Sequence, residues 1–400
     1  MLLHARHALV AFAISVSGIH TSAQQAPVNV QFDPGKGLIF QKDSTFTCVM
    51  RFRMQDRFGL ISTDGEDLSP ARSDIRVRRF RLRFDGHIIT KRLRYTLHMG
   101  FSKADLDLEA NTTPQPIRDA ILHYDVNPRF TVSLGQQKLP GNRQQVVASN
   151  NLQLIDRSIV TSSFTLDRDF GVWLTWKPVT GVQPVIVKGA ITSGEGRNAS
   201  PGDGKLCYTG RVEWLPLGTF TNDGDYSEGD LAMEPKPKLS IGVSYSGNDG
   251  ARRSGAQLGK VLYAGRTINT FIADMVFKHH GWALSSEFAR RESVQDPFTT
   301  DPLNSANTVG VYEGWGSCTQ LSKVFAAKNE VVARYARVTP GERMGAEVDK
   351  EEAWLGYNRY LQGHRVKLQG NISYSWTDDH AALDHVGNFW GAYLQIEIGI

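Results

Sequence analysis

The chain has 400 residues, a formal net charge of +4 and 40% hydrophobic residues, which is enough for a large core. The length would suit two or three soluble domains, but no charged linker, low-complexity spacer or change of periodicity divides the chain after Ser44. Cys48, Cys207 and Cys318 lack the paired spacing of a zinc site or a disulfide framework. The 38 glycines and 10% aromatic residues are typical of all-β proteins with many turns.

The first 23 residues have the features of an export signal. A basic start, a short apolar run over residues 8–16 and small residues at positions 21–23 follow one another. The apolar run is shorter than the roughly 20 residues of a membrane-spanning helix, although a helical core segment would give a similar pattern. No cysteine follows the run, which argues against a lipid-modified N-terminus. We predict a signal peptide over residues 1–23 and a lead-in segment over residues 24–43.

Apolar and polar residues then alternate, which is the pattern of strands whose two faces differ. The alternation predicts strands around residues 45–55, 79–85, 92–101, 239–245 and 366–376. In the last strand the apolar face reaches the terminal residue and consists of Trp390, Ala392, Leu394, Ile396, Ile398 and Ile400. No helical period of useful length is present, apart from a short helical turn within residues 141–159.

A transmembrane barrel and a soluble β-sandwich would both alternate in this way. The export signal and the strand at the very C-terminus favour the barrel, as do aromatic residues near strand ends, which form interfacial girdles in such proteins. The tryptophans in question are Trp173, Trp176, Trp214, Trp282, Trp354, Trp376 and Trp390. Roughly 375 mature residues, at about 22–24 per strand and connection, give a number of strands near 16. We therefore predict an all-β fold, a transmembrane antiparallel β-barrel over residues 44–400.

Positive charge is concentrated between residues 51 and 94, where twelve basic residues stand against six acidic ones. The set that we call the basic wall alternates with apolar residues and consists of Arg51, Arg53, Arg79, Arg81, Arg83, Arg92 and Arg94. One arginine facing lipid near the midplane costs ~2–4 kcal/mol, so seven would rival the ~5–15 kcal/mol that stabilises a typical fold. The basic wall must therefore face the lumen. A break in the alternation at Arg78 and Arg79 predicts a β-bulge.

Two interpretations of these arginines remain open. In the first, the arginines pair with acids and are simply solvated in a water-filled interior. In the second, they form a path for small anions, because rings of basic residues select anions and guanidinium groups bind oxyanions in a bidentate manner. A one-sided wall favours the anion path. A carboxylate beside the arginines could accept a proton from hydrogen phosphate, and the candidates are Asp105, Asp107 and Asp119. Each could instead be a plain ion pair.

Several segments resemble the phosphate-selective porin O and P family. The most specific runs from Gly135-Gln136-Gln137-Lys138-Leu139-Pro140 to Ile155-Asp156-Arg157-Ser158. Further matches are residues 117–124, 167–171, 194–196, 208–213 and 238–242, so that the resemblance covers nearly the whole mature chain. Phenylalanine often stands where this chain has Gln137, and many barrels end in phenylalanine rather than Ile400.

The resemblance implies a 16-stranded homotrimeric porin of the bacterial outer membrane whose third extracellular loop folds into the pore. In this chain that loop would run from about Leu139 to Arg168. It would bring Lys138, Arg143, Arg157 and Arg168 toward the constriction. The partners that it implies are small anions, such as phosphate or polyphosphate, and the lipid of the outer membrane.

No catalytic constellation is present, since GxSxG, HExxH and phosphate-loop motifs are absent from the sequence. His98 and His123 fall on the predicted lumen face, which argues against a lipase site facing lipid. We expect no enzyme activity, no cofactor, no metal site and no nucleic-acid partner. The alternative is an exported β-protein or barrel that binds polyanions through its basic face without conducting.

Overall fold

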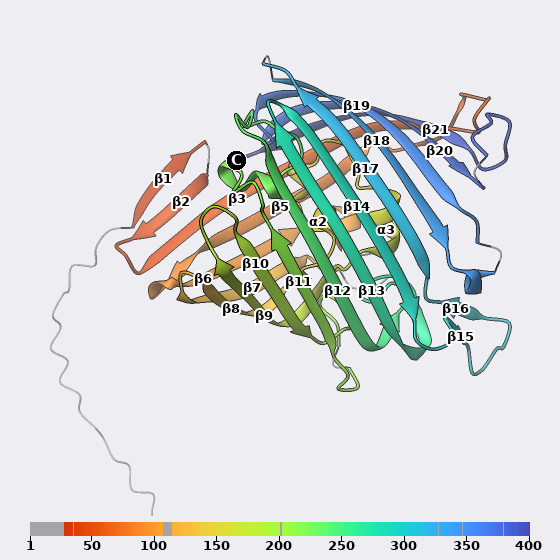
Figure 1. Ribbon diagram of the computed structural model, residues 1–400, viewed down its shortest axis with the longest axis horizontal. Coiled ribbons are helices and arrows are strands. Elements are labelled where there is room, and N and C mark those ends of the chain that lie inside the picture. The colour runs from red at the N-terminus through yellow and green to blue at the C-terminus, as the bar shows by residue number, and fades with distance from the viewer. Residues whose placement is uncertain are drawn as a thin grey trace, which may run out of the picture.

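The computed structural model describes residues 28–34, 36–106, 114–200, 202–326, 328–345, 347–378 and 380–400. Its main sheet is antiparallel and closes on itself, because β21 pairs with β3. Of the 19 described strands in this sheet, β1, β2 and β4 are short additions, which leaves a closed barrel of sixteen (Figure 1). The predicted all-β barrel of about 16 strands is confirmed. The predicted signal peptide lies outside the described residues.

The barrel strands are, in chain order, β3 (Phe46–Ser62), β5 (Arg76–Ile88), β6 (Thr90–Gly100), β7 (Ile117–Asn127), β8 (Phe130–Lys138), β9 (Arg168–Val179), β10 (Val185–Thr192), β11 (Cys207–Trp214), β12 (Lys238–Arg253), β13 (Val261–His279), β14 (Trp282–Ser293), β17 (Gly314–Val324), β18 (Asn329–Pro340), β19 (Lys350–Gln362), β20 (Val366–Thr377) and β21 (Phe389–Gly399). The remaining elements are β1 (Asn29–Asp33), β2 (Gly37–Lys42), β4 (Pro70–Ser73), β15 (Phe298–Thr300), β16 (Thr308–Gly310), α1 (Lys103–Leu106), α2 (Arg143–Val146) and α3 (Ile159–Phe164), with 3-10 turns at Ser149–Asn151, Thr221–Tyr226 and Glu342–Met344.

The lead-in segment contains two strands that the sequence pattern did not predict. β1 pairs with β2, and β2 pairs with the first residues of β3. The hairpin extends from the barrel beside β3 (Figure 1). Among the described residues, no helix is long and apolar enough to cross a membrane.

The two faces of the barrel strands have the polarity of a membrane barrel rather than of a soluble sandwich. Outward side chains are apolar and exposed, as in β20, where Leu368 and Ile372 are 44% and 53% exposed. Inward side chains are polar and buried, as are Lys367 and Gln369 of the same strand. A soluble protein buries its apolar residues and pairs any buried charge, so this inverted arrangement fits strands that face lipid on one side.

The predicted aromatic girdle needs a correction at two positions. Trp176, Trp214 and Trp282 point outward and are about half exposed. Trp173 is only 5% exposed, because it points inward and belongs to the buried apolar cluster inside the barrel. Trp354 also points inward, where its ring packs against the guanidinium of buried Arg334.

The predicted bulge at Arg78 is confirmed. Gln55 of β3 lies opposite Arg79 of β5, whereas the next residue, Asp56, lies opposite Val77, so that Arg78 is the extra residue. The bulge allows Arg78 and Arg79 both to reach the interior, where each contacts Asp156.

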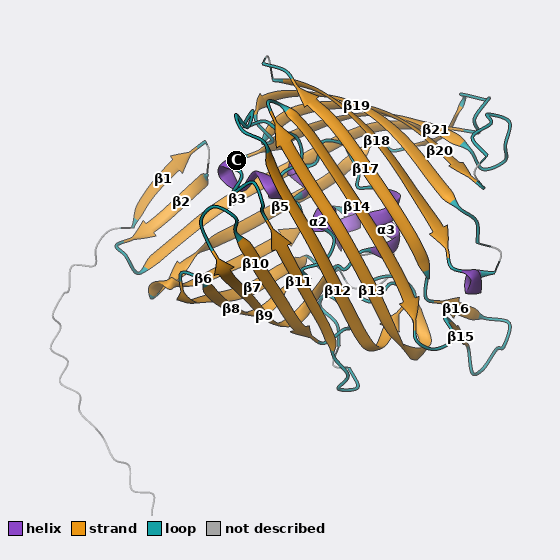
Figure 2. Cartoon of the chain, in the orientation of Figure 1, coloured by secondary structure: helices purple, strands orange, loops and turns teal. Residues whose placement is uncertain are grey.

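The connection between β8 and β9, which we call the inner loop (residues 139–167), lies inside the barrel. Figure 2 shows its helices within the ring of strands. α3 packs against β14, β17, β18 and β19, and its Val160 and Phe164 are fully buried in the apolar cluster with Ile272 and Ala336 of the barrel wall. The inner loop therefore fills the β12–β19 side of the lumen with apolar contacts.

A second connection, between β11 and β12, also folds inward; we call it the second inner segment (residues 215–237). Its Phe220 is buried against Leu215 and Val276. Its Glu228 joins it to the inner loop, since the Glu228 amide donates to the Asn151 carbonyl at 3.0 Å and its carboxylate accepts from the Gln153 amide at 2.8 Å. The two inner segments thus support one another in the middle of the barrel.

Basic side chains of the barrel wall satisfy the backbone carbonyls of both inner segments. Lys367 donates to the carbonyls of Asn150 and Leu152, and Arg291 donates to those of Ser163 and Thr165. Lys278 donates to three carbonyls of the second inner segment. Buried carbonyls need such donors, because leaving one unpaired costs as much as a lost hydrogen bond.

We predict that Lys367→Met destabilises the barrel. Lys367 is completely buried, and its loss leaves two inner-loop carbonyls without this donor, at a cost of roughly 2–4 kcal/mol. The measurement is urea-induced unfolding in lipid vesicles, followed by tryptophan fluorescence. Lys260→Met, at an exposed lysine, is the matched control. Equal unfolding midpoints for the two variants would contradict the role given to Lys367.

Candidate functional site

The register of three neighbouring strands assembles the basic wall. The pairing of β3 with β5 places Arg53 opposite Arg81 and Arg51 opposite Arg83. The pairing of β5 with β6 places His98 beside Arg83. Like charges directly opposite one another destabilise a sheet. This arrangement therefore needs acidic partners, anions, or both.

A cavity of about 710 Å³ lies against the basic wall. Of the residues predicted for the site, it is lined by Arg51, Arg53, Arg81, Arg83, Arg94, Lys138, Arg168 and Asp119. His98 and His123, expected on the lumen face, line it too. The structure thus brings most of the basic wall to a single space inside the barrel.

The other predicted residues lie elsewhere. Arg92 lines a neighbouring cavity of about 380 Å³, which Arg94 also borders. Arg79 donates to Gln55 at 2.7 Å and is buried behind the cavity surface. Asp107 lies outside the described residues.

Two of the cations expected at the constriction hold the inner loop together. Lys138 Nζ donates to the carbonyls of Gln145 and Val146. Arg157 donates to the carbonyls of Gln144 and Val147 at 2.7 and 2.8 Å. Both side chains therefore donate hydrogen bonds to carbonyl groups at the end of α2.

Arg143 lies on the far side of the inner loop from the basic wall. Its Nε donates to Asp274 at 2.5 Å and its Nη2 to Ser240 at 2.9 Å. Burial opposes its charge, but the negative charge of Asp274 outweighs burial and raises the pKa of Arg143. This residue anchors α2 to the opposite wall.

Asp105, a candidate acid for phosphate, is an ion-pair partner in this structure. Its carboxylate accepts from Arg81 Nε at 2.8 Å, from Arg118 at 2.9 Å and from the Ser102 hydroxyl at 3.1 Å. Burial opposes its ionisation, but hydrogen bonding to Arg81 and the charges of Arg81 and Arg118 lower the pKa of Asp105 well below its usual range. A carboxylate so held is ionised and already fully engaged.

Asp119 is engaged in the same way, although it lines the cavity. Arg168 Nε donates to one carboxylate oxygen at 2.7 Å. His98 Nδ1 lies 2.8 Å from the other oxygen. Asp85 likewise accepts from Arg83 Nε at 2.8 Å and pairs with Arg51. The acids of the site hold the guanidinium groups in fixed positions.

The inner loop presents neutral polar groups to the basic wall. Arg53 donates to Asn150 and to the Ser149 hydroxyl, each at 2.7 Å. Arg81 donates to the same Ser149 hydroxyl at 3.0 Å. The inner loop therefore meets these arginines with neutral acceptors, while the Glu397 carboxylate of the barrel wall lies 3.6 Å from Arg53 Nε.

The polar cavity-lining residues that sequence reasoning missed include Lys188, Arg211, Tyr226, Arg365 and Glu397. Lys188 lies 2.6 Å from the Tyr226 hydroxyl and over its ring, and it pairs with Glu213. Lys188 could have been found, since it alternates with valines on its strand. Tyr226 could not, because it belongs to the second inner segment, which carries no periodic signal.

The chemistry of the site is that of fixed positive charge. Groups of three or more side chains able to hold a metal ion do not occur among the described residues. Guanidinium and ammonium groups in a confined space bind and orient anions by charge and by directed hydrogen bonds.

Comparisons with known proteins agree with this geometry. Residues 50–265 match the family model described as phosphate-selective porin O and P. No curated protein matches the chain. The match covers the basic wall, the inner loop and the second inner segment.

Several solved structures share the fold. A loop-deletion mutant of OmpT, an outer membrane protein of Vibrio cholerae, has a TM-score of 0.57 at 11% identity, covering 88% of this chain and 99% of that one. The anion-selective porin from Comamonas acidovorans has a TM-score of 0.55 at 12% identity, covering 89% and 100%. OmpF of Salmonella typhi in complex with daunomycin has a TM-score of 0.56 at 12% identity, covering 90% and 100%. Identities this low show the fold alone.

The family match spans more than half of the chain, and the fold is that of outer-membrane barrels. The chain belongs to the phosphate-selective porin O and P family of outer-membrane porins.

Proposed function

We propose that this porin conducts small anions along the basic wall. The observation that carries the proposal is the charge of the cavity lining, which includes ten basic side chains and three acidic ones, Asp85, Asp119 and Glu397. Five acids pair with these bases from behind the lining, namely Asp105, Asp125, Asp167, Glu213 and Asp274. Positive charge remains in excess, and a positive field in a narrow aqueous path raises the local concentration of anions.

The confinement of the path supports the same proposal. The inner loop fills the β12–β19 side of the lumen with apolar contacts, so ions have to pass along β3, β5 and β6. Guanidinium groups spaced along these strands offer a moving anion one partner after another. Conduction requires binding that is weak enough to be reversed at each step.

The cargo is proposed as small oxyanions and halides, with phosphate among them. The acids that could have recognised the proton of hydrogen phosphate, Asp105 and Asp119, are engaged by arginines. The Glu397 carboxylate also pairs with Arg53, at 3.6 Å, and the neutral acceptors bonded to Arg53 are Ser149 and Asn150. Each of these two acceptors could accept that proton only if its hydrogen bond from a guanidinium group were broken.

Export by a signal peptide over residues 1–23 and assembly as a homotrimer belong to the same proposal. They rest on the N-terminal sequence pattern and on the family. One of the similar structures, OmpT of Vibrio cholerae, is described as a trimer form. The family and the fold point to a channel rather than an enzyme. The alternative of polyanion binding without conduction shares the basic wall and differs only in the absence of ion current.

The wild-type channel provides the most direct test of this proposal. In a planar bilayer under a potassium chloride gradient, we expect the reversal potential to lie close to the equilibrium potential of chloride, because the fixed lumen charge is positive. A reversal potential on the potassium side would contradict the anion path. Well-folded protein that gives no channels would favour the polyanion-binding alternative.

A second prediction concerns Arg83, which lines the cavity and is nearly half exposed as a side chain. Arg83→Gln leaves Asp85 with Arg51 and Thr96 and makes the local charge less positive. We expect the chloride-to-potassium permeability ratio to fall roughly twofold to fivefold, the size expected for one partly screened charge.

The matched control for that variant is Arg290→Gln. Arg290 is also exposed and paired with an acid, Glu292, but it is absent from the cavity lining. The permeability ratio of this variant should equal that of the wild type. An equal fall in both variants would show that the effect comes from overall charge rather than from the basic wall.

A further inference from the structure

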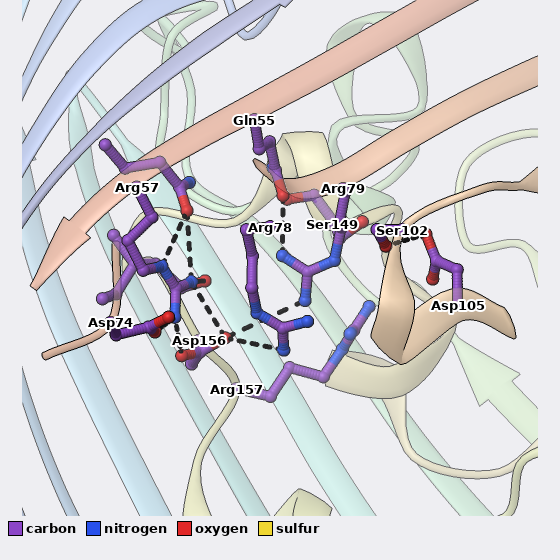
Figure 3. Close-up of polar contacts among 12 residues, drawn as sticks. Gln55, Arg57, Asp74, Arg78, Arg79, Ser102, Asp105, Ser149, Asp156 and Arg157 are labelled. Carbon is purple, nitrogen blue, oxygen red and sulfur yellow. Dashed lines mark hydrogen bonds and ion pairs between the residues drawn. The ribbon is translucent and has the colours of Figure 1, made fainter. Parts of the chain in front are cut away.

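Three arginines converge on one carboxylate where the inner loop meets β3 and β5 (Figure 3). The Asp156 carboxylate lies 2.7 Å from Arg57 Nη1, 3.4 Å from Arg78 Nη2 and 3.9 Å from Arg79 Nη2. Arg57 comes from β3, and the bulge of β5 supplies both Arg78 and Arg79. Figure 3 shows these guanidinium groups directed toward Asp156, with Arg157 beside them.

The cluster carries more positive than negative charge. Among the described residues, the acids paired with it are Asp156 and Asp74, and Asp74 is already shared between Arg57 and Arg76. Arg78 Nε is buried and has no hydrogen-bond partner. Arg157, the next residue along the loop, donates its hydrogen bonds to backbone carbonyls. Asp156 is therefore the one carboxylate that serves Arg78 and Arg79.

The pKa values agree with this surplus of positive charge. Burial opposes the ionisation of Asp156, but the charges of Arg57 and Arg78 outweigh it and lower the pKa of its carboxyl below the usual range. Burial, together with the charge of Arg81, lowers the pKa of Arg157 to about 10. Asp156 thus stays negative at any pH near neutrality, and mild acid does not remove it from the cluster.

The cluster lies in line with the basic wall. Along β3 and β5 the register runs from Arg57 with Arg76, through Gln55 with Arg79, to Arg53 with Arg81 at the cavity. The Asp156 side chain is 32% exposed and that of Arg78 is 20% exposed. Solvent therefore reaches the cluster, which along both strands directly follows the pair Arg53 and Arg81 at the cavity.

We propose that the Asp156 carboxylate is a tethered substitute for the transported anion, occupying an oxyanion site formed by Arg57, Arg78 and Arg79. This inference rests on the proposed function and adds a residue that sets affinity. A carboxylate presents two oxygens to guanidinium groups, as phosphate and sulfate do. An incoming oxyanion binds by displacing the carboxylate from Arg78 and Arg79, and the returning carboxylate releases it. Asp156 thereby keeps the site weak enough for passage.

The test is block of chloride current by inorganic phosphate in planar bilayers, with wild type and Asp156→Asn compared at neutral pH. Asparagine keeps the shape of the side chain and removes the competing charge. We expect phosphate to block Asp156→Asn at about tenfold lower concentration than the wild type, and sulfate to behave similarly, because the positive site is left unfilled. Asp156→Glu, which keeps a carboxylate, should restore block close to that of the wild type.

The matched control is Asp67→Asn. Asp67 is exposed in the turn that follows β3, and its carboxylate accepts a hydrogen bond from the neighbouring Ser69. This variant removes one negative charge at the same end of the strand without touching an arginine. A tenfold gain in Asp67→Asn as well would overturn the inference, since it would show a general effect of charge.

Heat-modified gel mobility shows whether Asp156→Asn folds. If it does not fold, a variant of one of the arginines tests the same inference. Arg78→Gln leaves the bond between Arg57 and Asp156 in place and should weaken phosphate block several-fold. Unchanged block in Asp156→Asn or in Arg78→Gln, measured in an anion-selective wild-type background, overturns this inference and leaves the proposed function standing. A wild-type channel that prefers potassium overturns both.

Discussion

Everything inside the barrel depends on one requirement: backbone carbonyls that have left water need hydrogen-bond donors. The inner loop and the second inner segment contain little regular structure, so side chains supply those donors. Lys138, Arg157, Lys278, Arg291 and Lys367 each donate to such carbonyls. Ammonium and guanidinium groups suit this task, because each carries several donors and no acceptor. Much of the positive charge of the lumen is thus committed to holding the two segments in place.

The same contacts divide the lumen into two unequal parts. On the β12–β19 side, α3 is packed against apolar wall residues, and the cavity lined by Arg143, Asp274 and Glu287 has a volume of only about 40 Å³. On the β3–β9 side, the basic wall faces an open space. The position of the inner loop therefore decides which side chains can meet an ion. Arg143 lies beyond the loop and bonds to Asp274 and Ser240, whereas Arg83 lines the cavity and belongs to the proposed anion path.

The sequence predicted what depends on local periodicity and missed what depends on contacts between distant segments. The sequence could show which side of each strand faces lipid, because every lipid-facing arginine would cost free energy at its own position. It could also show the bulge at Arg78, because the bulge interrupts the alternation of apolar and polar residues. The inward position of Trp173 also follows from alternation, because Trp176 is three residues away on the same strand and therefore faces the opposite side. The partners of Asp105 and Asp119 lie on other strands, and their pairing requires a register that alternation alone does not give.

Acids behind the arginines explain how so many like charges can stand together. Asp85 is shared by Arg51 and Arg83, and Asp105 by Arg81 and Arg118. Each shared carboxylate offsets repulsion between two guanidinium groups and fixes their direction, while positive charge remains in excess. The number of arginines is then a poor guide to anion affinity, because a guanidinium bound on both edges has no donor left for a passing ion. On the proposed anion path, affinity depends on how easily an anion can replace the acceptor that an arginine already has. We propose that this exchange is easiest at Asp156, where the acceptor is partly exposed and shared.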